Sequence, residues 1–205
     1  MIEQYENILQ ISVLFLCSIV ALRRALRERS RTWGFTFFFF ISWLMGDVYW
    51  VACLVFYGDT PQVSVVSDLS WYASLIFLYL LLQQTTGPDI KAKRSLIPWI
   101  GPVFATAMGT FFVRWGNIIS NVVYEFLMTF LLYSVIARLV DLKQYRKQLF
   151  LCVLILVFLM REYAMWTASC FWYEESISNP YYWFDTLLTL SFPFFIPAAR
   201  KADAT

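Results

Sequence analysis

Long apolar runs, each bounded by charged or turn residues, constrain the fold of this chain more than any other feature. A helix needs about 20 largely apolar residues to cross the hydrocarbon core of a bilayer. Seven such runs are present, at approximately 7–22, 32–58, 69–84, 95–113, 115–137, 148–173 and 181–199. Composition agrees, because 60% of the 205 residues are hydrophobic and only 15% are charged. The sequence predicts an all-α polytopic membrane protein, a bundle of seven transmembrane helices forming one domain over residues 1–205.

Basic residues are concentrated in alternate connecting segments. Fourteen of the sixteen Lys and Arg residues follow the first, third, fifth and seventh runs, namely Arg23, Arg24, Arg27, Arg29, Arg31, Lys91, Lys93, Arg94, Arg138, Lys143, Arg146, Lys147, Arg200 and Lys201. An excess of Lys and Arg marks cytoplasmic segments. We therefore expect the N-terminus outside, the C-terminus in the cytoplasm, and a multi-pass location in a bacterial inner membrane or plasma membrane.

Ionisable residues inside the apolar runs are the first candidates for a functional site. There are five, Asp47, Glu125, Arg161, Glu162 and Asp185. A charge at the bilayer centre costs about 2.5 to 3.5 kcal/mol on insertion scales, so such residues usually face the bundle interior. Counting helical turns from the outer ends places all five in the outer half of the bundle. Four carboxylates and one guanidinium leave an excess of negative charge, which protonation, a water-filled cavity or a bound cation or cationic ligand would relieve.

The adjacent residues Arg161 and Glu162 lie about 100° apart around a helix, so we expect them to reach different neighbours. Arg161 is predicted to bridge to Asp47 or Glu125. Two interpretations remain open. The charges form a structural ion pair that joins helices while the other acids stay wet, or they line a pocket for a ligand or ion.

Aromatic residues surround these acids at helical spacing. Trp43 and Trp50 flank Asp47, and Trp166 follows Glu162 by four residues. Because aromatic faces stabilise cations, we include all three in the predicted ligand-binding site. The aromatic group at 181–183 is more typical of the belt that Trp and Tyr form at membrane interfaces.

Metal, cofactor and nucleic-acid sites are not predicted. The chain has no histidine, and its four cysteines (Cys17, Cys53, Cys152 and Cys170) lie in apolar runs without CxxC spacing. We interpret them as buried thiols, with a disulfide between Cys53 and Cys170 left open. The net charge of +2 is too small, and the basic residues too scattered, for a nucleic-acid surface.

Small residues and prolines in the later runs predict local packing. Gly101, Ala105 and Gly109 recur every four residues, which permits close approach of a neighbouring helix. Pro193 and Pro197 are expected to kink or end the last helix.

A more specific pattern lies between residues 46 and 82. It reads Gly46-Asp47-Val48-Tyr49-Trp50, then Gly58, Pro61, Ser67-Asp68 and Trp71-Tyr72 before a leucine-rich helix. The pattern resembles the multi-helix integral-membrane sensor region found N-terminal to some bacterial diguanylate cyclases. The resemblance implies an input module that detects something at or outside the membrane. Because no cyclase or kinase domain follows Arg200 in this sequence, we expect a separate cytoplasmic or membrane signalling partner.

Three functions are compatible with these features. The favoured one is a non-enzymatic sensor or receptor-like module that binds a small polar or cationic ligand in an outward-facing pocket. The second is a proton- or cation-coupled transporter that uses the buried acids. The third is an intramembrane enzyme acting on lipid, with Asp47 and Glu125 as acid and base. The absence of histidine and of a GxSxG motif disfavours hydrolysis by zinc or a serine triad.

Overall fold

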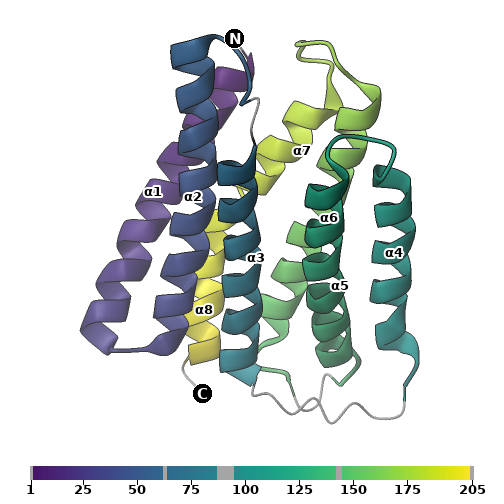
Figure 1. Cartoon of the computed structure of the whole chain (residues 1–205). Helices are drawn as coiled ribbons and strands as arrows, with labels where there is room; N and C mark the ends of the chain where they lie inside the picture. The colour runs from purple at the N-terminus through teal and green to yellow at the C-terminus, as the bar shows by residue number, and fades with distance from the viewer. Residues whose placement is uncertain (1, 62–63, 87–94, 142–144, 204–205) are drawn as a thin grey trace.

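The computed structural model describes residues 2–61, 64–86, 95–141 and 145–203, which form helices joined by short connections (Figure 1). The helices are α1 (Ile2–Glu28), α2 (Arg31–Tyr57), α3 (Val65–Thr86), η1 (Ile97–Trp99), α4 (Ile100–Phe112), α5 (Ile118–Val140), α6 (Leu149–Phe171), α7 (Pro180–Thr189), η2 (Phe192–Phe194) and α8 (Phe195–Asp203). The described residues include no strand, which confirms the all-α prediction. Four of the basic loop residues, Lys91, Lys93, Arg94 and Lys143, lie outside the described ranges.

Five of the helices are long and apolar enough to cross a membrane: α1, α2, α3, α5 and α6. The segment Ile97–Phe112, which contains η1 and α4, is apolar but shorter. Successive segments run in opposite directions, and the two ends of the chain lie at opposite ends of the bundle (Figure 1). We call the end with the N-terminus the upper end.

The first and the last predicted helices differ most in extent from those observed. The first was predicted over 7–22 but spans Ile2–Glu28, because the helix also includes the charged residues on both sides of the apolar run. The seventh was predicted as one helix over 181–199 but is divided into α7, η2 and α8. Pro193 lies inside η2 and has no N–H to donate, so the predicted interruption at this proline is confirmed.

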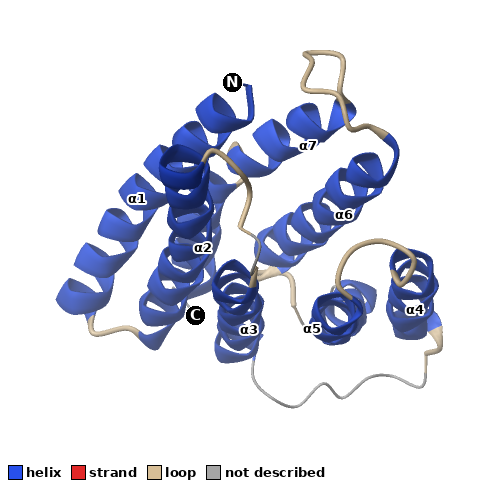
Figure 2. Cartoon of the chain, turned by 45° about the horizontal axis from the view of Figure 1, so that its top comes forward, coloured by secondary structure: helices blue, strands red, loops and turns tan. Residues whose placement is uncertain are grey.

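The helices pack as a ring. Going around it, α1 contacts α2, α2 contacts α3, α3 contacts α5, α5 contacts α6, α6 contacts α7, and α7 returns to α1. The short helix α8 packs against α6 and α2, in the lower half of the bundle. Helix α4 stands outside the ring against α5 (Figure 2). In this arrangement, side chains of the six ring helices line the upper part of the ring interior.

Small residues on α4 allow its close contact with α5. A Cβ atom added at Gly101 would lie 2.9 Å from the Cβ atom of Leu132, and one added at Gly109 would lie 2.9 Å from Cγ of Glu125. Ala105, between the two glycines, is fully buried. The predicted small-residue packing surface is therefore confirmed.

Aromatic side chains fill the lower part of the ring. Phe39, Phe158, Phe192 and Phe195 are fully buried, and their ring centroids lie 5.0 to 5.9 Å apart in the pairs Phe39–Phe195, Phe158–Phe192, Phe158–Phe195, Phe39–Phe158 and Phe39–Phe192. Trp43 lies one turn above Phe39, with its centroid 5.3 Å from Phe158 and 5.5 Å from Phe192. Such edge and tilted contacts are favourable geometries for aromatic rings. The cluster closes the ring interior beneath Trp43.

A buried arginine lies near the lower end of α5. Arg138, predicted to lie in the segment after the fifth helix, is within α5 and only 1% exposed. Its guanidinium donates to Thr86 Oγ1 at 2.6 Å, to the Ser134 carbonyl oxygen at 2.9 Å and to Gln83 Oε1 at 3.1 Å. The Tyr145 ring lies 5.9 Å from its Cζ atom. Helix α5 continues one turn further than predicted because these neutral groups satisfy the charged side chain.

Candidate functional site

A cavity of about 490 Å³ lies inside the ring at its upper end. Its volume is in the range of small-molecule sites. All six ring helices contribute side chains to it, including Asn7, Gln10, Trp43, Asp47, Trp50, Trp71, Tyr124, Glu162, Trp166, Tyr181 and Asp185. Exposed residues of the upper loops, Thr60, Trp172 and Tyr173, form its rim, and Trp43 lies deepest, against the aromatic cluster.

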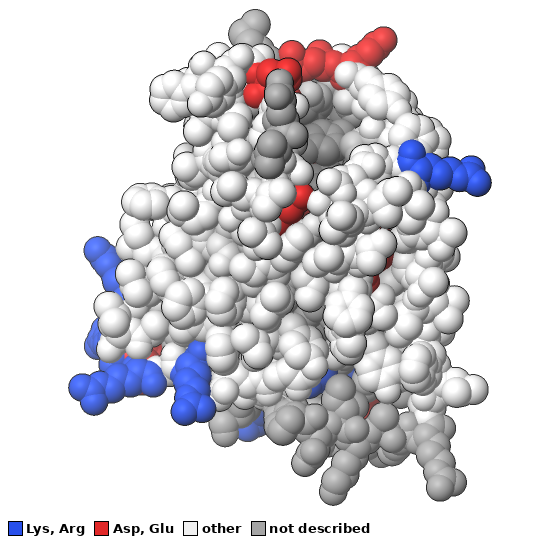
Figure 3. Space-filling view, viewed as in Figure 1, with Lys and Arg blue, Asp and Glu red and all other residues white. Residues whose placement is uncertain are grey.

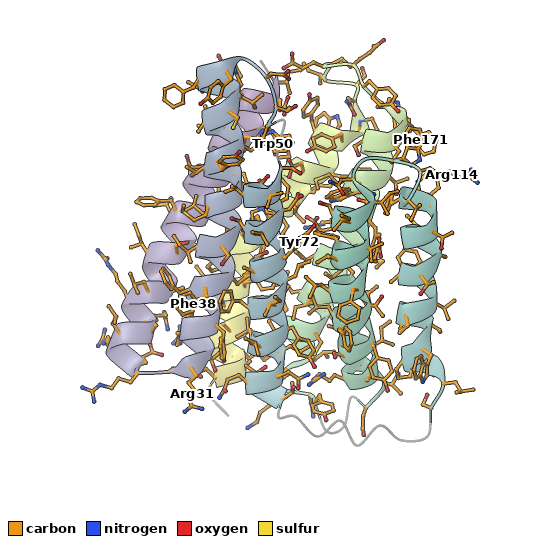
Figure 4. The ribbon with its side chains drawn as sticks, in the orientation of Figure 1. Arg31, Phe38, Trp50, Tyr72, Arg114 and Phe171 are labelled. Atoms are coloured by element: carbon orange, nitrogen blue, oxygen red, sulfur yellow. The ribbon has the colours of Figure 1, made fainter. Side chains whose placement is uncertain are left out.

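Six of the eight predicted site residues line this cavity: Trp43, Asp47, Trp50, Glu162, Trp166 and Asp185. They come from α2, α6 and α7, so residues far apart in sequence meet in one space. Figure 4 shows Trp50 on the upper part of α2, with the labelled Tyr72 lower down on α3. The other two predicted residues, Glu125 and Arg161, do not line the cavity.

Asp47 is 2% exposed and is oriented by an indole. Trp71 Nε1 donates to its Oδ1 atom at 3.2 Å, whereas its Oδ2 atom is buried and has no hydrogen-bond partner. Gly46 makes this contact possible, because a Cβ atom there would lie 2.7 Å from Trp71 Nε1. The close approach of the Trp71 indole to Asp47 therefore depends on the absence of a side chain at Gly46.

Glu162 on α6 is bound in a similar way. The Tyr124 hydroxyl donates to its Oε2 atom at 2.7 Å, and Trp166 Nε1 donates to the same oxygen at 3.3 Å. The Oε1 atom is buried without a hydrogen-bond partner. As at Asp47, neutral aromatic donors hold one carboxylate oxygen and leave the other unpaired.

Asp185 on α7 meets a polar face of α1. Gln10 Nε2 donates to Asp185 Oδ1 and to Thr189 Oγ1, each at 3.0 Å. The buried carboxyl of Glu6 interacts electrostatically with Asp185, and neither Glu6 oxygen has a hydrogen-bond partner within normal distances and angles. Sequence reasoning missed this face of α1 because the helix was predicted to begin at about residue 7. The spacing of Glu3, Asn7 and Gln10, by four and then three residues, is the signal that would have revealed it.

The electrostatic character of the cavity is acidic. Asp47 interacts electrostatically with both Asp185 and Glu162, and Glu162 also interacts with Asp185. Among the described residues that line the cavity, none is Lys or Arg. In Figure 3 the Asp and Glu side chains gather toward the upper end, and most Lys and Arg side chains toward the lower end. Buried like charges repel strongly, and protonation, water or a positively charged occupant would each relieve this repulsion.

Aromatic rings form much of the cavity wall. The Trp50 and Trp71 centroids are 5.9 Å apart, and those of Tyr124 and Trp166 are 5.3 Å apart. Trp50 Nε1 also donates to Glu3 Oε1 at 3.1 Å. Of the group predicted as an interfacial belt, Tyr181 and Tyr182 line the cavity, while Trp183 is exposed and donates to the Ile177 carbonyl oxygen.

Glu125 lies outside the cavity. It accepts a hydrogen bond from the Tyr163 hydroxyl at 2.8 Å and packs against Gly109 of α4. A space of about 10 Å³ beside it is also lined by Tyr124, Glu162 and Trp166, which line the main cavity. The expected convergence of all five ionisable residues is therefore wrong for Glu125, because Tyr163 turns this carboxyl toward α4.

Arg161 also lies elsewhere. Its predicted bridge to Asp47 or Glu125 is wrong, because its Nη1 atom donates to the Leu187 carbonyl oxygen at 2.7 Å on the exposed side of α6 and α7. This carbonyl lies where α7 is interrupted, and the Ser191 N–H that would pair with it in a continuous helix bonds to Leu188 instead. The expectation that Arg161 and Glu162 reach different neighbours is confirmed.

No metal site is evident in the described residues, which contain no cluster of three or more His, Cys, Asp or Glu side chains suited to an ion. All four cysteines are buried free thiols, so Cys53 and Cys170 are not paired. Comparisons with protein-family models, curated proteins and solved structures find no match to this chain.

Proposed function

We propose that this chain is a receptor-like membrane module that binds a small organic ammonium ion in the upper cavity. The observation that carries this proposal is the set of carboxyl groups, Asp47, Glu162 and Asp185, around a cavity whose described lining includes no Lys or Arg. Asp47 and Glu162 are nearly fully buried, and they interact electrostatically with each other and with Asp185. An ammonium group in the cavity would offset the repulsion among these carboxyl groups.

The chemistry of the walls favours an organic cation. Indole and phenol faces stabilise ammonium groups by about 0.5 to 2 kcal/mol each, and Trp43, Trp50 and Trp166 supply such faces. A small inorganic ion would need several oxygen ligands around one point. Asp47 and Glu162 each accept from an aromatic donor and come from different helices, α2 and α6, an arrangement that suits a larger cation better than a bare ion.

The proposed topology is seven crossings with the N-terminus outside, so that the cavity opens outward. The five long helices support this topology, together with the Ile97–Phe112 segment and the interrupted α7–α8 segment. Basic residues at the lower end support a cytoplasmic location for that end. In intact cells, a membrane-impermeant maleimide should label Asp59→Cys but not Arg29→Cys, and the reverse labelling would reject this orientation.

Binding without passage is favoured over transport because the aromatic cluster is packed directly beneath Trp43. Fully buried rings of Phe39, Phe158 and Phe192 occupy the interior of the ring below the cavity. A transporter would have to open this cluster in each cycle. Liposomes containing the chain should bind a labelled alkylammonium ion without accumulating it, and saturable accumulation in them would favour the transporter.

Ligand titration tests the proposal. Purified chain is titrated with tetramethylammonium, butylammonium, butanol and Na⁺ while tryptophan fluorescence is recorded, since four tryptophans line the inner cavity. We expect saturable changes with the organic cations only. Asp47→Asn and Glu162→Gln should each weaken binding by about tenfold or more, as expected for loss of a charge-assisted contact of about 1.5 to 3 kcal/mol.

Glu125→Gln is the matched control, because it removes a carboxylate from the same bundle but outside the cavity. Its affinity should equal that of the unmodified chain. Equal weakening in all three variants would mean that overall charge or folding, and not the cavity, determines binding. No response to any cation across millimolar concentrations would reject the proposal.

A further inference from the structure

A groove on the outer surface of the helix bundle runs along α6 between α4 and α7. Its volume is about 420 Å³. Ala164, Thr167 and Ala168 of α6 form its base, and larger side chains form its walls, including Phe104 and Met108 of α4 and Phe184 of α7. Alanines four residues apart at the base allow the close approach of another helix. The groove is thus shaped for the side chains of a helix that lies along α6.

A charged side chain lies beside the lower end of this groove, next in sequence to Met160, which lines it. Arg161 is one turn below Ala164, and Leu187, whose carbonyl it contacts, is one turn below Phe184. Arg161 lies ten residues from Phe171 at the upper end of α6, about 15 Å along the helix, which places it near the middle of the span. Among the described residues it makes one hydrogen bond and no ion pair, although a guanidinium has five N–H donors.

We infer that this surface, the groove with Arg161 beside its lower end, docks a transmembrane helix of a partner protein that carries a carboxylate at mid-membrane depth. An arginine remains charged in proteins, so a mid-membrane guanidinium on an outer face is expensive until a partner supplies a negative or strongly accepting group. The partner's acid would bind the free N–H groups of Arg161. Its small or apolar residues would occupy the groove above.

Other occupants fit these observations less well. Lipid phosphates lie at headgroup depth, about 15 Å above Arg161, beyond the reach of the side chain. A second copy of this chain offers no suitable acid toward the middle of its described spans, because Asp47, Glu162 and Asp185 are buried and Glu125 is bonded to Tyr163. A distinct membrane protein with an intramembrane Asp or Glu is the occupant that the charge requires.

The position of the groove also links it to the cavity. Glu162 faces the cavity while the adjacent Arg161 faces outward, and Trp172 borders both spaces. A ligand that shifts α6 would therefore shift the docking surface. This signalling role rests on the proposed function, whereas the docking surface itself does not.

Host–guest peptides in lipid vesicles test the inference without a ligand. The full chain, labelled with an acceptor fluorophore, is mixed with donor-labelled leucine-rich transmembrane peptides that carry Glu, Gln or Leu at the central position. Energy transfer should show that the Glu peptide associates about tenfold more tightly than the Leu peptide. Arg161→Gln should abolish the difference, and Arg161→Lys should retain part of it.

Groove filling provides an independent variant if Arg161→Gln unfolds α7. Ala164→Phe should weaken association of the Glu peptide, while Ser12→Phe, on the exposed face of α1, should not. Equal association of the three peptides, or insensitivity to both Arg161→Gln and Ala164→Phe, would overturn the inference. Energy transfer between donor-labelled and acceptor-labelled copies of the chain that persists when the Glu peptide is added would also overturn it. Titration of the same vesicles with butylammonium reports separately on the cavity.

Discussion

The buried arginine of the lower half of the helix ring and two buried acids of the upper half differ in how far their hydrogen-bonding groups are satisfied. In the lower half the Arg138 guanidinium is surrounded by acceptors on Thr86, Gln83 and Ser134. In the upper half Asp47 and Glu162 each retain a buried oxygen without a partner. The lower half also contains the packed aromatic cluster, whereas the upper half contains the cavity.

This contrast separates groups that hold the fold together from groups that are available to a ligand. A charged group whose donors are used by its neighbours stabilises the folded state, and its removal costs free energy. A carboxylate that faces other carboxylates across a cavity destabilises the folded state until protonation, water or a cation relieves the repulsion. Neutralising the arginine of the lower half and an acid of the upper half should therefore change stability with opposite signs.

The largest effect is expected from Phe158→Ala in the aromatic cluster. Phe158 is fully buried and contacts the rings of Phe39, Trp43, Phe192 and Phe195. Truncation should lower the free energy of unfolding by about 3 to 5 kcal/mol, because it leaves a cavity in a packed core. Denaturant unfolding in mixed micelles, followed by helical circular dichroism, measures this loss. A loss below about 1 kcal/mol would mean that the lower half is not tightly packed.

Arg138→Met is expected to have the next largest effect, a loss of about 2 to 4 kcal/mol in the free energy of unfolding. The substitution removes the donors to Thr86 Oγ1 and Gln83 Oε1, which are partly buried acceptors, and to the buried Ser134 carbonyl oxygen. Arg138→Lys is the matched control, since it retains the charge without the planar fork, and it should lose less. A gain in stability on Arg138→Met would mean that Arg138 destabilises the folded state, as we expect of the acids in the upper half.

Gly46→Ala should cost about 1 to 3 kcal/mol, and it probes the junction between packing and site. A Cβ atom at this position would lie 2.7 Å from Trp71 Nε1, so the indole has to move and release Asp47. The tryptophan emission spectrum should shift, and ammonium binding should weaken in parallel. Gly34→Ala on the same helix is the control, because no atom lies within 4 Å of a Cβ atom there. Equal effects of the two substitutions would exclude the specific Trp71 contact.

Sequence reasoning was most successful where a signal depends on one helix. Apolar length predicted the long helices, proline predicted the interruption at Pro193, and small residues predicted the contact of Gly101 and Gly109 with α5. The angular offset of adjacent residues correctly separated Arg161 from Glu162. Each of these properties is local, so it can be inferred without knowing which helices are neighbours.

The errors arose where the outcome depends on how helices are arranged around the ring. The depth of Glu125 was consistent with a shared site, but its rotation toward Tyr163 and α4 depends on the packing of α4 outside the ring. The partner of Arg161 is a carbonyl exposed by the break in α7, which charge counting does not reveal. The polar face of α1, with Glu6 and Gln10, became part of the site only through the α1–α7 contact. A linear sequence specifies none of these adjacencies.

Asp47→Asn should produce the smallest change in stability, and one opposite in sign to that at Arg138. Asparagine retains an oxygen to accept the Trp71 indole N–H, and it removes a carboxylate that interacts with Asp185 and Glu162. We expect the free energy of unfolding without ligand to stay the same or to increase by up to about 1 kcal/mol, because repulsion in the cavity decreases. Affinity for an ammonium ion should nevertheless fall about tenfold, so ligand-induced stabilisation should be lost. Unfolding curves with and without saturating butylammonium give both quantities from one preparation. A variant that is less stable without ligand would mean that Asp47 holds the helices together as Arg138 does, and the contrast between the two halves would then fail.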